Sequence, residues 1–188
     1  MGTRDEFVDR FAQMILDLPQ DVKAVFDLVD DAEIVDEGRV AACGALVSLL
    51  QPGDLIPDSL GPVALVDDVV TMRLAAEFAV PEGHPRRAAH AEKHPEFYGA
   101  LSDDIALAKE AFGDAFVLLE QRLRRLGTLE HKGRRASKIA GDDRASTWLF
   151  EEVDEALTEM EMDEDSLGAS LRKFDQAVAQ MRRRLVRR

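Results

Sequence analysis

The sequence is short of cysteine and of aromatic residues, and these shortages restrict the kinds of protein that it can encode. Cys43 is its single cysteine, which excludes an intramolecular disulfide and a cysteine-rich metal site. Aromatic residues make up 6% of the chain, with one tryptophan and one tyrosine. The chain does not open with a charged segment followed by an apolar one, so secretion is not indicated. A reducing cytoplasm is therefore the expected compartment.

Uninterrupted apolar runs are also short. The run Val40–Leu50 holds no charge but has only 11 residues, whereas a membrane-spanning helix needs ~20. The run Leu60–Val80 is long enough, but it contains charged residues that include Asp67 and Arg73. Each charge at membrane depth would cost ~2.5–3.5 kcal/mol. We therefore expect two buried helices packed against each other in place of a membrane span.

The chain lacks a run of alternating β-branched residues, whereas alanine, leucine, acidic residues and arginine are abundant, which favours helices. Apolar residues recur at helical spacing along most of the chain. The clearest repeat, spaced as in a heptad, is Leu167, Leu171, Phe174, Val178, Met181 and Leu185. We predict an all-α protein, a helical bundle with a long C-terminal helical hairpin or coiled-coil-like module. Its predicted parts are a helical domain at 1–80, a connector at 81–100 and a helical module at 101–188.

Charge is distributed unevenly along a chain whose net charge is −13. Residues 1–80 carry a net charge of −11, whereas residues 171–188 carry +6. An acidic body argues against nucleic-acid binding, and only the basic C-terminus could contact an anionic membrane surface. Residues 151–165 hold nine acids and no base, so the last two helices are expected to pair as an antiparallel hairpin. The alternative is a free basic tail that recruits an anionic partner.

A turn between the two apolar runs concentrates carboxylates, in the segment ALVSLLQPGDLIPDSLGPVALVDD at residues 45–68. Asp54 and Asp58 are placed to close a turn and to cap the next helix. Asp67 and Asp68 point about 100° apart on a helix, so at least one faces the apolar side and needs a partner. That partner is Arg73 or a base from another helix. The alternative is that all four aspartates converge on a divalent cation such as Mg²⁺ or Ca²⁺.

This segment resembles the YkvA-like family, a bacterial domain of unknown function. The matching residues are Pro52, Asp54, Leu55, Ile56, Pro57, Asp58, Asp67 and Asp68, within a resemblance that extends from Gly38 to about Val80. The chain departs from the family pattern at Ser48, at Ala64 and in the position of Pro62. The resemblance implies a helical fold and, because many relatives are regarded as membrane-associated, membrane association as an alternative to a cytoplasmic location. It implies no reaction.

Three of the four histidines, His84, His90 and His94, lie close together in the sequence. His90 and His94 are four residues apart, which places both imidazoles on one face of a helix, as in helix-borne zinc sites. With Glu92 or Asp67 as a third ligand, they would form a mononuclear hydrolytic site. The alternative is that they are surface histidines in a polar connector.

Residues 127–146 are basic and contain glycine, which predicts a mobile loop or a frayed helix. Within them, residues 134–137 (RRAS) resemble a basophilic kinase site. The chain carries no glycine-rich phosphate loop, dinucleotide fingerprint or nucleophile elbow.

Because no complete catalytic set is found, our first hypothesis is a non-catalytic interaction or scaffold protein. Its heptad face, or the apolar region Leu60–Val80, would engage a protein partner or a second copy of the chain. The second hypothesis is a metal-dependent enzyme that uses the aspartates, the histidines or both. The third is a peripheral membrane protein held by its arginine-rich C-terminus, at ~1 kcal/mol per basic residue near the surface.

Overall fold

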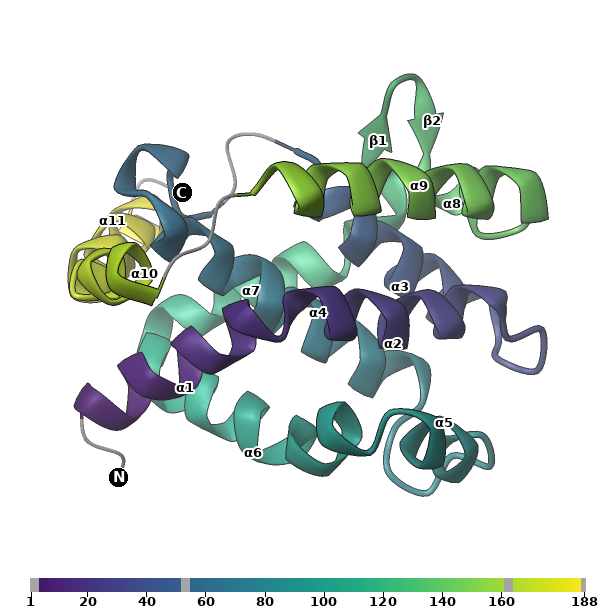
Figure 1. The fold of residues 1–188 in the computed structure, drawn as a ribbon, viewed down its shortest axis with the longest axis horizontal. Coiled ribbons are helices and arrows are strands. Elements are labelled where there is room, and N and C mark those ends of the chain that lie inside the picture. The colour runs from purple at the N-terminus through teal and green to yellow at the C-terminus, as the bar shows by residue number, and fades with distance from the viewer. Residues whose placement is uncertain (1–3, 52–54, 161–163, 187–188) are drawn as a thin grey trace.

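The computed structural model describes residues 4–51, 55–160 and 164–186, and it confirms the predicted all-α class (Figure 1). The α-helices are α1 (Arg4–Leu16), α2 (Leu18–Asp30), α3 (Asp36–Leu49), α4 (Leu65–Ala79), α5 (Arg87–Lys93), α6 (Pro95–Phe112), α7 (Phe116–Leu123), α8 (Ala136–Ile139), α9 (Asp143–Glu159), α10 (Glu164–Leu171) and α11 (Phe174–Val186). Short 3₁₀ turns are η1 (Asp58–Leu60), η2 (Pro62–Ala64), η3 (Gly113–Ala115) and η4 (Leu126–Thr128), and a two-stranded hairpin pairs β1 (Glu130–His131) with β2 (Arg134–Arg135).

Helix α4 lies at the centre of the molecule, in contact with α1, α2, α3, α6 and α7 (Figure 1). Its residues from Val66 to Ala76 are all buried. Helix α3 packs against α4 along its length, and its buried stretch runs from Ala41 to Leu49. The two apolar runs are thus buried helices in contact with each other, as the sequence predicts. Within the described residues, every helix is too short or too polar to cross a membrane.

Small residues in α3 let neighbouring backbone approach it closely. A Cβ atom on Gly44 would lie 2.5 Å from backbone atoms of Leu126 in η4, so only glycine leaves room for this contact. The neighbouring Cys43 is fully buried, and burial raises the pKa of its thiol to about 12. Cys43 is therefore a packing residue with an unreactive thiol.

The second half of the chain is divided more finely than its periodicity predicts. Apolar residues spaced as on one long helix run from Leu101 to Leu126, but the helix begins earlier, at Pro95, and is interrupted at Gly113, which has a φ of +56°. Residues 127–146, expected as a mobile loop or frayed helix, are instead ordered as η4, the β-hairpin and α8. Asp142 then caps α9, where its carboxylate accepts hydrogen bonds from the backbone N–H groups of Arg144 and Ala145.

The heptad residues lie on two consecutive helices, α10 and α11, whose apolar face packs inside the chain itself. Five of them are buried in the core: Leu167, Leu171, Phe174, Val178 and Met181. The sixth, Leu185, is partly buried and packs against the core. Helix α10 packs on α1 and η2, whereas α9 packs on α2, α3 and α8. Figure 1 shows α9 and α11 on different parts of the molecule, so the expected antiparallel hairpin between them does not form. Charge complementarity alone does not pair two helices whose apolar faces belong to different neighbours.

Residues from all three predicted segments contribute to one hydrophobic cluster. The two ends of the described chain meet there, since the ring centroids of Phe11 and Phe174 are 5.0 Å apart. The division at 1–80, 81–100 and 101–188 stays a prediction, while the packing joins these segments through a shared core. The segment 81–100 holds α5 and the start of α6, which position the site described next.

Candidate functional site

The predicted aspartate cluster is held by an arginine. Asp67 and Asp68 are buried at the start of α4, and both form ion pairs with Arg122 of α7. Asp67 also accepts a hydrogen bond from the backbone N–H of Leu55, at 3.1 Å. The base from another helix is thus Arg122, and Arg73 has different partners. Asp58 is exposed in η1, and Asp54 lies outside the described residues.

The predicted histidine pair faces two different carboxylates, one in α2 and one directly after it. His90 Nε2 lies 2.9 Å from Asp31 Oδ2, and His94 Nε2 lies 2.5 Å from Asp27 Oδ2. Both pairs are spaced four residues apart, so they join α5 to the end of α2. Among the described residues, no group of three or more histidine, cysteine or acidic side chains is placed to hold a metal ion.

A third group of charges forms a buried network near His94, and its centre is Arg73 of α4. Arg73 Nε donates to Asp104 Oδ2 at 2.7 Å, and its Nη1 donates to Asp21 Oδ2 at 2.8 Å. Arg10 completes the network by donating from Nε and Nη2 to the two oxygens of Asp104. The first three residues are only 2–3% exposed. Helices α1, α2, α4 and α6 each supply one member.

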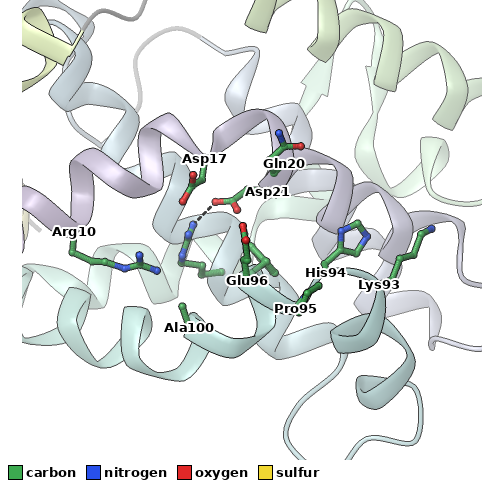
Figure 2. Close-up of a pocket in the computed structure, with 11 residues that line it drawn as sticks. Arg10, Asp17, Gln20, Asp21, Lys93, His94, Pro95, Glu96 and Ala100 are labelled. Carbon is green, nitrogen blue, oxygen red and sulfur yellow. Dashed lines mark hydrogen bonds and ion pairs between the residues drawn. The ribbon is translucent and has the colours of Figure 1, made fainter.

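Arg10, Asp21 and Arg73 of this network form one wall of a pocket of about 510 Å³. The lining residues come from α1, α2 and α4 and from the junction of α5 with α6: Arg10, Asp17, Gln20, Asp21, Arg73, Lys93, His94, Pro95, Glu96, Phe97 and Ala100. Figure 2 shows the carboxylates of Asp17, Asp21 and Glu96 turned toward the same space, and Lys93 turned away from it. The pocket is within the usual size range of small-molecule sites, ~300–1,000 Å³.

Burial perturbs the ionisation of Asp21, the carboxylate in the wall of this pocket. Burial raises the pKa of Asp21 to about 6, against the opposing effect of Arg73. The nearby charges of Asp17 and Asp104 raise the pKa further. The same carboxylates favour the charged form of Arg10, whose pKa is raised chiefly by its hydrogen bond to Asp104. Strongly perturbed groups that line a pocket are candidates for a functional site.

The rim of the pocket contains a second set of charges that are paired with each other. Asp27 Oδ2 lies 2.6 Å from Lys93 Nζ and also contacts His94 Nε2. Burial raises the pKa of Asp27, but the hydrogen bonds from Lys93 and His94 outweigh it, so the pKa is lowered overall. Asp27 therefore stays ionised and holds the side chains of Lys93 and His94 toward α2.

The arginines and the lysine of the pocket thus form ion pairs, whereas two of its acids form none among the described residues. Arg10 and Arg73 face Asp21 and Asp104, and Lys93 and His94 of the rim face Asp27. Asp17 accepts a hydrogen bond from a neighbouring glutamine but has no ion pair within the part of the chain that the structure describes. The exposed carboxylate of Glu96 likewise has no cationic partner there. The pocket can therefore accept positive charge without losing an internal ion pair.

The sequence indicates that Arg73 needs a buried partner, but it does not indicate which residues pair with it. Arg73 stands inside the apolar run Leu60–Val80, and a charge in such a position must be paired when the run is buried. Asp21 and Asp104 stand beside the apolar stripes of their helices without a local partner in sequence. Their convergence depends on how α2, α4 and α6 pack, which helical periodicity alone does not encode.

Comparisons with protein-family models, with curated proteins and with solved structures gave no match to this chain. The resemblance to the YkvA-like family accordingly stays a prediction. Function is therefore argued below from the geometry of the pocket and from the charges that surround it.

Proposed function

We propose that the protein is a non-catalytic binding protein that holds a small organic cation in the pocket formed by α1, α2, α4 and the α5–α6 junction. The observation that carries this proposal is that the arginines of the pocket are ion-paired, whereas two of its acids are not paired within the described part of the chain. Asp17 and Glu96 lack a cationic partner among the described residues, while Arg10 and Arg73 are already neutralised by buried carboxylates. An amine or guanidinium group would supply the missing charge.

The composition of the pocket favours binding over chemistry. None of its lining residues, all within the described ranges, is a serine, threonine or cysteine, and the amine of Lys93 and the imidazole of His94 are held by Asp27. An organic cation is favoured over a metal ion, because the described residues offer no set of three metal-ligating side chains. The buried network fixes the wall of the pocket before a ligand arrives, which reduces the ordering that binding requires.

This proposal keeps the binding role suggested by the sequence but changes the surface. The heptad face packs into the core of the chain, so a partner could use it only if α10 and α11 moved away. The apolar region of α4 is likewise enclosed. The pocket, in contrast, opens to solvent beside the exposed carboxylate of Glu96.

The proposal is tested by isothermal titration calorimetry with agmatine, putrescine and arginine as probes, and with succinate as an anionic comparison. We expect at least one cation to bind and succinate to give no heat. Glu96→Gln should weaken that binding roughly tenfold or more, since hydrogen bonds to a charged group contribute ~1.5–3 kcal/mol. Affinity should also fall below about pH 6, where Asp21 takes up a proton.

Glu92→Gln is the matched control, because Glu92 is an exposed acid of α5 that does not line the pocket. It makes the same change in net charge four residues away. Equal loss of affinity in both variants would reduce the effect to general electrostatics and contradict the proposal. Absence of binding by all three cations at millimolar concentration would also contradict it.

A further inference from the structure

A second pocket, of about 600 Å³, lies between the β-hairpin, α8 and the start of α9, and its lining is basic. Its charged lining residues are Glu130, Arg134, Arg135, Lys138, Asp142 and Arg144. Four of these six are cations, in a chain whose net charge is −13. This local reversal of charge is unrelated to the cation pocket, because the two share no lining residue.

The cations of this basic pocket are not neutralised internally. Arg135, Lys138 and Arg144 are exposed, and within the described ranges their side chains form no ion pair or hydrogen bond. Asp142 does not offset them fully, because one of its oxygens accepts two backbone N–H groups as the cap of α9. Glu130, the other acid of the lining, forms no ion pair among the described residues, and Glu152 beside the hairpin is already occupied by Lys132 and His131.

An aromatic ring positions the fourth cation. The guanidinium carbon of Arg134 lies 4.2 Å from the ring centroid of Trp148, a cation–π contact. His131 stacks on the same ring, with centroids 5.9 Å apart. Arg134 is thereby held on the hairpin at the edge of the pocket, so its planar fork of donors is partly ordered before any ligand binds.

We propose that this basic pocket binds a small ligand that carries a phosphate or pyrophosphate group. Three arginines and a lysine around one hollow match the oxygens of such a group, because guanidinium donates to phosphate through two parallel hydrogen bonds. Both sources of this chemistry, a free inorganic anion and an organic phosphate ester, would engage the same donors.

The charge of the surrounding protein selects a small anion over a polymer. At physiological salt the screening length is ~8 Å, so the pocket attracts an anion that fits within it. A nucleic acid or an anionic membrane would extend beyond the pocket onto neighbouring acidic surface. Helix α9 continues from the pocket into a segment with acids and no base, residues 151–159. That segment would repel an extended polyanion.

Trp148 provides a built-in probe, because it is the only tryptophan in the chain and carries Arg134 on its ring. Titration with pyrophosphate, inorganic phosphate and adenosine diphosphate should change its fluorescence and release or absorb heat in calorimetry. Tighter binding of the diphosphate ester than of pyrophosphate would identify an organic ligand, and the reverse order would identify the free anion. Arg135→Gln/Arg144→Gln should weaken binding at least tenfold.

Lys23→Gln is the control, since Lys23 is an exposed cation of α2 that lines neither the cation pocket nor the basic pocket. It should leave the affinity unchanged. The proposal is overturned if none of the three anions binds at millimolar concentration, or if Lys23→Gln weakens binding as much as the double variant. It is also overturned if an oligonucleotide or anionic vesicles bind more tightly than every small anion.

Discussion

Substitution of Arg73 by methionine should destabilise the protein strongly, because it leaves Asp21 buried without a cation. Asp104 would keep its two hydrogen bonds from Arg10, whereas Asp21 would lose the one ion pair that it forms among the described residues. Removing one partner of a buried ion pair costs ~3–5 kcal/mol. Because domains are stable by only ~5–15 kcal/mol, this loss is a large part of the free energy of unfolding.

The size of this effect should depend on pH, and its sign follows from Asp21. Burial raises the folded-state pKa of Asp21 from 3.8 to about 6, so the folded protein binds this proton more tightly than the unfolded chain does. Its contribution to stability is therefore present below about pH 4 and declines as the pH rises to about 6. Without Arg73 the pKa rises further, and the decline extends to higher pH. The difference between Arg73→Met and the unaltered protein should thus grow from about pH 5 to about pH 8.

The double variant Arg73→Met/Asp21→Asn separates the lost ion pair from the lost packing. It removes both charges and leaves Asp104 paired with Arg10, so most of the lost stability should return and its dependence on pH should disappear. Urea unfolding followed by circular dichroism at both pH values measures these differences. A single variant that loses under ~1 kcal/mol, or a double variant no more stable than the single one, would refute the assigned role of the network.

Two further predictions concern close packing and a buried hydrogen bond. Gly44→Ala should lower the free energy of unfolding by ~1–3 kcal/mol, because the added Cβ would clash with the backbone of Leu126. Gly99→Ala, whose added Cβ would have no atom within 4 Å, should raise it by ~0.5–1 kcal/mol. A lower melting temperature for both variants would contradict this contrast. Ser170→Ala should cost ~1–3 kcal/mol, because Ser170 Oγ bonds two buried backbone groups of the η1–η2 turn. The exposed Ser102→Ala should change the unfolding midpoint little, and equal effects at the two serines would refute that role.

The sequence predicts properties that depend on one segment at a time. Helical spacing and the lack of alternating strands are sufficient for the all-α class, and the apolar runs of α3 and α4 are sufficient for their burial. The need of Asp67 and Asp68 for a cation also follows from local sequence. Their actual partner, Arg122, lies on α7, more than fifty positions away. Choosing it over Arg73 requires knowing how α7 packs on α4.

The heptad repeat shows a different limit. Apolar residues at this spacing define one face of a helix, but the same spacing suits a face that packs inside its own chain and a face that binds a second one. The structure places these residues of α10 and α11 in the core. Apolar spacing also does not mark where a helix is interrupted, since Gly113 divides a stretch whose apolar spacing continues on both sides.

The charge that a binding site presents to a ligand depends on which of its side chains are already paired. The net charge of the whole chain is a poor guide to it. The chain is strongly acidic, yet in the first pocket two arginines and an equal number of buried carboxylates cancel each other, and the groups without an ion pair among the described residues are acids. In the basic pocket, one of the two lining acids caps a helix, and cations outnumber acids among the lining residues without an ion pair in the described part of the chain. Because exposed charges are screened over ~8 Å, each pocket responds to its own uncommitted groups. One acidic protein can therefore offer sites of opposite preference, and the two titrations proposed above test them independently.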